Sequence, residues 1–250
     1  MGLLFWLLIG ISLIIGSACV INNYIDRDID KYMDRTKKRA LVTGKVSGLN
    51  ANIYASILGL LGFLILIHYT NLLTVIIGAI GIFSYVVVYG YYKRRSVHGT
   101  LIGSVSGSTS LVAGYCVVSG RFDTFALILF VIMAVWQMPH FYAIGIYRKK
   151  DYAEASLPIL PVVKGIPKTK KHIIYYIVLF ILSTSLLTLF GATGFIYLVT
   201  MLITGLYWLW LAIKGLSANN NIKYGHQIFG FSLVTLLIFS TMISINYYLP

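Results

Sequence analysis

The sequence predicts an all-α membrane protein, a polytopic helical bundle with about eight transmembrane helices in a single domain over residues 1–250. Hydrophobic residues make up 58% of the chain and charged residues only 11%. The apolar stretches are long enough to cross a hydrocarbon core of about 30 Å. They run continuously, without the two-residue alternation of strands, and a spanning segment must otherwise belong to a closed barrel. Helices are therefore the expected element throughout.

The predicted helices cover 3–21, 50–68, 72–91, 100–118, 124–146, 173–190, 194–213 and 226–249. The first stretch lacks the charged start and the small-residue cleavage site of a signal peptide, so we expect it to remain as a helix. It would have to start outside with no positive charge before it, an awkward start that a missing upstream helix would explain. Glycines recur in several helices, and we expect them to serve close helix packing: Gly59, Gly62, Gly78, Gly81, Gly99, Gly103 and Gly107.

The basic residues predict the orientation. Nineteen of the 20 lysines and arginines fall in four connecting segments that share one face: seven in 22–49, three in 91–99, seven in 147–172 and two in 214–225. The positive-inside rule assigns this face to the cytoplasm and the C-terminus to the outer side. The charge suits lipid headgroups or phosphates. Because no soluble basic domain exists, we do not expect nucleic acid as a partner.

Carboxylates are rare, and four of the seven lie just after the first helix. If that helix continues, Asn22, Asp26, Asp30 and Asp34 recur every four residues and form one stripe. Like charges at this spacing repel, so a bound cation is expected on the stripe. Mg²⁺ is the natural candidate, because it is usually held by one or two carboxylates and by phosphate oxygens of the substrate. Asp28 points away.

A plainer interpretation of the stripe is a solvated, charged helix end. In that case Asp30 and Asp34 pair with Lys31, Lys37 and Lys38, and Asp34 is as easily explained this way as by metal binding. We also expect Asp28 to pair with Lys31. Basic residues near the acids would complete a site that encloses a polyanion such as diphosphate, although lipid anchoring explains any single one equally well. They are Arg27, Lys31, Arg35, Arg39, Lys93, Arg94, Arg148 and Lys164.

A second acidic segment follows the fifth predicted helix. Tyr147 and Asp151 are four residues apart at the helix end, and Glu154 follows. His140 comes directly after Pro139 within the membrane span, where the proline is expected to kink the helix. A single intramembrane histidine is usually a hydrogen-bonded core residue. Its depth, about 10 Å of helix rise from Tyr147, also suits contact with a substrate in a cavity.

These segments resemble the UbiA superfamily of intramembrane prenyltransferases. NNYIDRDID carries the Asn-x-x-x-Asp-x-x-x-Asp pattern of that superfamily, and the resemblance covers essentially the whole chain. MDRTKKRALVTGKVS, YGYYKRRSVHGTLIGSVSG, WQMPHFYAI and DYAEASLPILPVVKG are similar to its haem-modifying branch. Family members generally have nine helices, so the resemblance implies that the first is missing here. Tyr147 stands where the wider superfamily commonly has an aspartate, which makes a second Mg²⁺ site less secure.

The resemblance implies a reaction in which the farnesyl group of farnesyl diphosphate is transferred to a vinyl group of haem B, giving haem O and diphosphate. It implies Mg²⁺ as cofactor on Asp26, Asp30 and Asp151, and diphosphate contacts from Asn22, Asn23 and the basic residues given above. A haem or prenyl cavity would involve Trp136, Gln137, His140, Phe141 and Tyr147. Aromatic residues lining a prenyl tunnel would include Phe83, Tyr85, Tyr89 and Tyr142. The implied setting is the bilayer of the cytoplasmic (inner) membrane, with haem A synthase or a terminal oxidase as a partner.

Three other functions remain open from the sequence. A prenyltransferase for an aromatic quinone precursor would share the Asp26 and Asp30 logic but not the haem-branch segments. A secondary transporter would place broken helices and charges near the membrane midplane, whereas these acids lie at helix ends. A truncated, inactive chain would be a non-catalytic assembly factor for an oxidase.

Overall fold

The computed structural model describes residues 2–246, which fold into helices joined by turns and loops, with no strand in that range. Eight segments within it are long and apolar enough to span a membrane, which confirms the predicted fold class. They are α1 (Gly2–Ile25), α3 (Gly48–Tyr69), the continuous run Leu72–Tyr92, α6 (Gly99–Ser119), α7 (Thr124–Tyr147), α10 (Gly165–Leu189), α11 (Phe195–Lys214, extended to Ser217 by the short η2) and α12 (Asn221–Ile245). The run Leu72–Tyr92 combines α4 (Leu72–Phe83), η1 (Ser84–Tyr89) and α5 (Gly90–Tyr92).

Two helices start earlier than predicted. α10 begins at Gly165 and not at 173, and α12 begins at Asn221 and not at 226. The early turns of α10 carry Lys168, Lys170 and Lys171, whose charges made this part resemble a loop in the hydropathy pattern. Residues 247–249, the end of the eighth predicted helix, lie outside the described residues.

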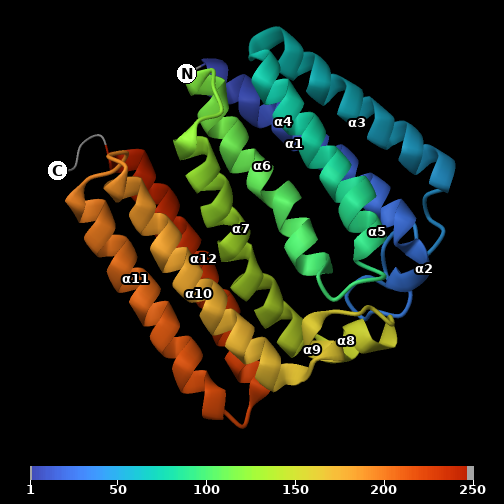
Figure 1. Cartoon of the computed structure of the whole chain (residues 1–250). Helices are drawn as coiled ribbons and strands as arrows, with labels where there is room; N and C mark the ends of the chain where they lie inside the picture. Colours follow the sequence, from blue (N-terminus) through green and yellow to red (C-terminus); the bar gives the residue numbers. More distant parts are fainter. Residues whose placement is uncertain (1, 247–250) are drawn as a thin grey trace.

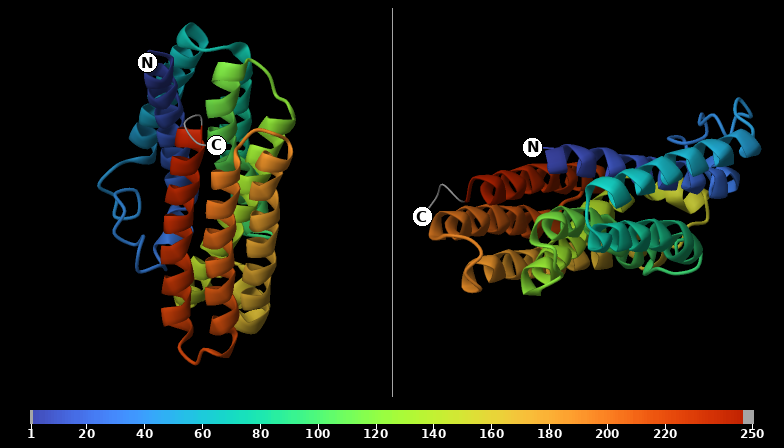
Figure 2. Two further views of the ribbon diagram at one scale, coloured as in Figure 1. Left: turned by 90° about the vertical axis from the view of Figure 1, so that its left-hand side faces the viewer. Right: turned by 90° about the horizontal axis from the view of Figure 1, so that it is seen from above.

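The helices form an elongated bundle whose two ends differ (Figures 1 and 2). The short helices α2 (Arg27–Asp30), α8 (Lys149–Glu154) and α9 (Leu160–Val163) gather at one end, where the chain between α2 and α3 also projects. The links at the opposite end are short. Nearly all basic residues thus lie at the elaborated end, as the charge pattern predicted.

α7 is the central helix and packs against α6, α10 and α12. The main apolar core lies on the α10–α12 side of α7, where Phe180, Tyr197 and Trp208 are almost fully buried. α1 pairs closely with α3 on the other side: a Cβ at Gly62 would lie 2.9 Å from the backbone oxygen of Gly10. Such close backbone approach is how helices gain contact in lipid, where apolar burial alone gives little advantage.

Asp123 caps the start of α7. Its Oδ1 accepts hydrogen bonds from the backbone N–H groups of Phe125 (3.0 Å) and Ala126 (3.2 Å), and its Oδ2 accepts from the Tyr115 hydroxyl (2.8 Å). These bonds satisfy donors that a helix start otherwise leaves without partners. The only carboxylate outside the two acidic segments therefore has a structural role.

We expect Asp123→Ala to lower the thermal unfolding midpoint by roughly 3 °C while leaving activity at permissive temperature unchanged, because the α7 cap is lost. Thermal unfolding of the purified protein in detergent measures this. Asp123→Asn, which keeps a capping oxygen, is the matched control. Equal midpoints for the alanine and asparagine variants would show that the cap does not contribute.

Candidate active site

The first acidic segment turns the chain at the end of α1. α1 ends at Ile25 and α2 covers only Arg27–Asp30, so the continuous helix considered for the stripe does not extend to Asp34. Asp26 and Asp30 still lie one turn apart, since the Asp30 N–H donates to the Asp26 carbonyl oxygen at 2.8 Å. Both side chains are buried, at 7% and 4% exposure. Asp34 is exposed and pairs with Lys37 at 2.5 Å, as the plainer interpretation allowed.

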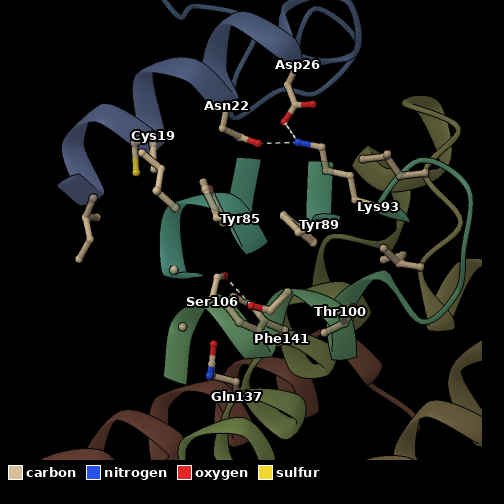
Figure 3. Close-up of a pocket in the computed structure, with 18 of the residues that line it drawn as sticks. Cys19, Asn22, Asp26, Tyr85, Tyr89, Lys93, Thr100, Ser106, Gln137 and Phe141 are labelled. Carbon is tan, nitrogen blue, oxygen red and sulfur yellow. Dashed lines mark hydrogen bonds and ion pairs between the residues drawn. The ribbon is translucent and has the colours of Figure 1, made fainter. Parts of the chain in front are cut away.

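Each buried acid is held by a base from elsewhere in the chain. Lys93 donates to Asp26 Oδ2 and to Asn22 Oδ1, both at 2.5 Å (Figure 3), and Arg39 donates to Asp30 Oδ2 at 2.5 Å. Burial lowers the pKa of Lys93, and its hydrogen bond to Asp26 opposes that shift. Each of the two buried carboxylates is therefore paired with a base.

Arg94 fastens the loop before α6 to the end of α1. Its guanidinium bonds both carboxylate oxygens of Asp28 at 2.8 Å, the Ile25 carbonyl at 2.6 Å and Asp26 Oδ1 at 3.2 Å. This contact lowers the pKa of Asp28 and raises that of Arg94. The predicted Asp28–Lys31 pair is thus wrong. Arg94, which is distant in sequence, forms a bidentate contact with Asp28, and a lysine cannot form such a contact.

A cavity of about 540 Å³ opens beneath the acidic pair. It lies between α1, the α4–η1 run, α6 and α7, with the acidic turn and the α8–α9 segment over its end. One end is polar, and the other is apolar and bounded by residues such as Ile11, Ile14 and Ile82. The wall from Ile11 to Asn22 spans about 16 Å of helix rise. The cavity is thus elongated, with one polar and one apolar end, and it matches the shape and polarity of a lipid that has a charged head group.

The η1 segment supplies the aromatic wall of the cavity. It is a π-helix, a wider winding that is frequently found at functional sites. Tyr85 and Tyr89 both line the cavity, with ring centroids 5.6 Å apart and near-parallel planes (Figure 3). Phe141 and Tyr142 line it from α7. Phe83 is 58% exposed and does not line the cavity, so its expected place there is wrong.

Several glycines expected to serve helix packing do so, and they also lie in the cavity wall. Gly78, Gly81, Gly103 and Gly107 all line it. A Cβ at Gly107 would lie 2.0 Å from Gln137 Oε1. The Gln137 amide is fixed at this place, because its Nε2 donates to the Ser104 carbonyl at 3.1 Å. Cys19 of α1 also lines the cavity.

The two acidic segments meet over the cavity. Met33 from the first segment packs against Ala155 and Leu157 from the second, forming a small apolar cluster. Asp151 is buried, and its Oδ2 has no hydrogen-bond partner; the Arg148 guanidinium lies 3.6 Å away, too far for such a bond. Within residues 2–246 no three His, Cys, Asp or Glu side chains converge, so Asp151 does not complete a three-carboxylate cluster with Asp26 and Asp30.

The structure brings part of the predicted site together. Eight of the predicted residues line the cavity: Asn22, Asp26, Asp30, Arg35, Arg39, Lys93, Gln137 and Phe141. Arg35 has no carboxylate partner among the described residues. The other predicted residues are not in the cavity lining: Asn23, Arg27, Lys31, Arg94, Trp136, His140, Tyr147, Arg148, Asp151 and Lys164.

The residues outside the lining have other contacts. Arg27 lies over the Tyr24 ring and donates to the carbonyl of the same residue. Lys31 lies over the ring of Tyr32. Tyr147 stacks on His226 of α12 with ring centroids 4.1 Å apart. Trp136 and His140 also contact α12.

The fold, the buried acidic pair and the amphipathic cavity together define a membrane enzyme that handles a lipid with a charged head. A model of the UbiA prenyltransferase family matches residues 1–244, and the chain belongs to this family. A relative from Yersinia pseudotuberculosis serotype O:1b (strain IP 31758) is 49% identical over 241 residues, covering 96% of this chain and 82% of the relative. Another, from Citrobacter koseri, is 46% identical over 249 residues, covering 99% and 84%. Both are named protoheme IX farnesyltransferase.

Solved structures share the fold at low identity. A structure described as digeranylgeranylglyceryl phosphate synthase has a TM-score of 0.78 and 19% identity, covering 97% of this chain and 84% of that one. A UbiA homolog from Archaeoglobus fulgidus, described as bound to GPP and Mg²⁺, has a TM-score of 0.67 and 15% identity, covering 98% and 88%. These likenesses establish the UbiA-type architecture.

Proposed function

We propose that this chain transfers the farnesyl group of farnesyl diphosphate to a vinyl group of haem B, and that water adds to the resulting carbocation as a hydroxyl group, giving haem O and diphosphate. The observation that carries the proposal is the buried pair Asp26 and Asp30 at the polar end of an amphipathic cavity. The relatives' names supply the acceptor, and the cavity supplies a place for an isoprenyl diphosphate. A transporter would be expected to have a cluster of charged residues near the membrane midplane. Among the described residues the buried acids lie at helix ends instead.

The donor atoms at the polar end fit Mg²⁺. Asn22, Asp26 and Asp30 present hard oxygen ligands to one cavity, and Mg²⁺ is usually held by one or two carboxylates together with substrate phosphates. Asp151 is buried with an oxygen that lacks a partner, but it does not line the cavity, so it would have to turn toward the diphosphate to support a second ion or a bridging water. Bound there, Mg²⁺ would supply positive charge to the leaving diphosphate.

The bases at this end then receive the diphosphate. Lys93 bonds one oxygen of Asp26 and Arg94 the other, so Lys93 would have to leave Asp26 for a metal ion to bind there and would then be available to the phosphate oxygens. Arg39 bonds only Oδ2 of Asp30 and can contact the phosphate from its present side. Arg35, on the cavity wall with no carboxylate partner among the described residues, adds a third cation. Fixed charges in a water-poor site stabilise the negative charge that grows on the leaving oxygen as the allylic C–O bond breaks.

The apolar end receives the farnesyl chain, and Gly78 sits at that end on α4. We expect Gly78→Phe to shift donor preference from farnesyl toward geranyl diphosphate, because a Cβ there would lie 3.5 Å from Ile14 of the cavity wall and the added ring would push that wall inward. The ratio of kcat/KM values for the two donors measures this. Ile76→Phe is the matched control, since Ile76 is 46% exposed on the same helix and does not line the cavity. An unchanged ratio of kcat/KM values in the Gly78 variant would mean that the farnesyl chain does not bind at this end of the cavity.

The setting follows from the charge pattern and the chemistry. The elaborated, basic end would face the cytoplasm of the inner membrane, which places diphosphate release there and the C-terminus on the outer side. The haem product remains lipid-soluble. The class of partner that fits is a membrane enzyme or oxidase that uses the modified haem, such as haem A synthase or a terminal oxidase.

The direct test is turnover by the purified chain in lipid nanodiscs with farnesyl diphosphate and Mg²⁺. Haem B and 4-hydroxybenzoate are offered as competing acceptors, and mass spectrometry identifies the products. We expect farnesylated haem and no farnesylated benzoate. Benzoate product alone would favour the quinone-precursor alternative, and no product with either acceptor would favour a non-catalytic role.

A further inference from the structure

We propose that His140 ligates the iron of the haem acceptor through Nε2 and thereby positions the porphyrin beside the cavity. This inference rests on the proposed function and adds the place where the acceptor binds. It starts from a buried group that the diphosphate chemistry leaves unused, a histidine within the membrane-spanning part of α7. Ionisable residues at such depth are costly and usually functional.

Hydrogen bonds at Ser232 of α12 favour one tautomer of the His140 ring. The Ser232 hydroxyl donates to the Phe229 carbonyl at 2.6 Å. His140 Nδ1 lies 2.8 Å from the same hydroxyl oxygen. With the hydroxyl proton of Ser232 on the Phe229 carbonyl, the Ser232 oxygen accepts and Nδ1–H is the donor in that contact. In this tautomer the neutral imidazole has its lone pair on Nε2.

This is the arrangement of a metal-binding histidine. Histidines that bind metals almost always donate their other N–H to a fixed acceptor, which sets the tautomer and the ring orientation. His140 Nε2 has no hydrogen-bond partner among the described residues. It is also not among their side-chain nitrogen and oxygen atoms that are fully buried without a partner, so it remains accessible. The ring itself is only partly buried.

The neighbouring groups hold the ring in place. Trp136 stacks on it with centroids 5.0 Å apart, and Phe229 lies 4.8 Å away from the α12 side. Trp136 Nε1 donates to the Ser232 carbonyl at 3.0 Å. The side chains of Trp136 and His140 therefore both form hydrogen bonds to Ser232 of α12. A ligand held by packing and hydrogen bonds loses little freedom when a metal arrives, and flat apolar rings suit a porphyrin.

His140 also lies next to the cavity along the chain. Phe141 contacts the His140 ring edge-to-face at 5.2 Å and lines the cavity, as does Gln137 on the turn before. A porphyrin whose iron is held at His140 would therefore have its edge near Phe141, at the wall of the space assigned to the farnesyl chain. Acceptor and donor would meet across one turn of α7.

The test separates iron ligation from general porphyrin contact. Ferric haem and metal-free protoporphyrin IX are titrated into the wild-type protein and His140→Ala in nanodiscs, and absorption spectra are recorded. We expect a nitrogen-ligated haem spectrum in the wild type. In His140→Ala we expect at least tenfold weaker haem affinity, unchanged affinity for metal-free porphyrin, and recovery of the ligated spectrum with added imidazole. His226→Ala, which alters a histidine on the same α7–α12 seam, is the control and should behave as wild type.

Ser232→Ala keeps the histidine but removes the acceptor of Nδ1–H, and we expect a smaller loss of haem affinity with metal-free porphyrin again unaffected. Equal loss of both porphyrins in His140→Ala, with no recovery by imidazole, would assign His140 a purely structural role. Equal binding of haem by wild type and variant would overturn the inference outright. Farnesyl transfer by the wild type, measured separately, decides the proposed function independently of these spectra.

Discussion

Asp26→Asn is expected to lower the rate of farnesyl transfer by about 10²–10³-fold while the protein stays folded in the membrane. Asn keeps the shape of the side chain and can still accept a hydrogen bond from Lys93, so the packing around Asn22 and Lys93 is preserved. It removes the negative charge that a divalent cation needs. The loss would fall on the step in which charge develops on diphosphate, and kcat should drop more than KM rises.

Asp34→Asn is the matched control for this prediction. It is the same substitution in the same segment, at an exposed carboxylate whose contact is with Lys37. We expect it to retain near wild-type turnover. The measurement is haem O formation by the purified variants at saturating Mg²⁺. Wild-type turnover by Asp26→Asn, or equal losses in both variants, would remove the special role of the buried acid.

Lys93→Met is expected to lower turnover by about 100-fold and, at the same time, to tighten the binding of Mn²⁺ alone by roughly tenfold, or about 1.4 kcal/mol. The two effects share one cause. In the wild type the ammonium group occupies Asp26 Oδ2 and Asn22 Oδ1, so a metal ion must displace it into a buried, low-dielectric space. Diphosphate supplies an anion for the displaced lysine, so metal and diphosphate should bind cooperatively.

Metal binding is followed by the electron paramagnetic resonance signal of free Mn²⁺, with and without inorganic diphosphate. In the wild type, diphosphate should strengthen Mn²⁺ binding much more than in Lys93→Met. Lys45→Met is the control, because it removes the same charge from an exposed site with no ion pair among the described residues. If Lys93→Met bound Mn²⁺ no more tightly than Lys45→Met, the lysine would not be a competitor for the metal site.

Hydropathy and charge predicted the helical bundle and its asymmetric ends, because lipid imposes length and backbone pairing on each span. The Asp26 and Asp30 pair was also predictable, since a four-residue spacing keeps two side chains on one side of a helical turn. Helix starts were predicted less well: the lysines of α10 continue a helix beyond the apolar run, where hydropathy gives no signal.

The partners of the acids were not predictable from one sequence. Lys93 and Arg94 lie in a distant loop, and tertiary packing alone decides that the first contacts Asp26 and the second mainly Asp28. The glycines were correctly assigned to helix packing, since a Cβ at Gly107 would lie against Gln137 of α7. That Gly78 and Gly107 also line the cavity depends on how the helices are arranged in space, which the spacing of glycines does not show.

The most direct test of the account is a structure of the chain in nanodiscs with Mg²⁺ and farnesyl thiodiphosphate, an unreactive analogue of the donor. The account predicts the diphosphate group between Asp26 and Asp30, the farnesyl chain pointing toward Ile11 and Gly78, and Lys93 moved from the carboxylate to a phosphate oxygen. A diphosphate bound away from the acidic pair, with Lys93 still on Asp26, would contradict it.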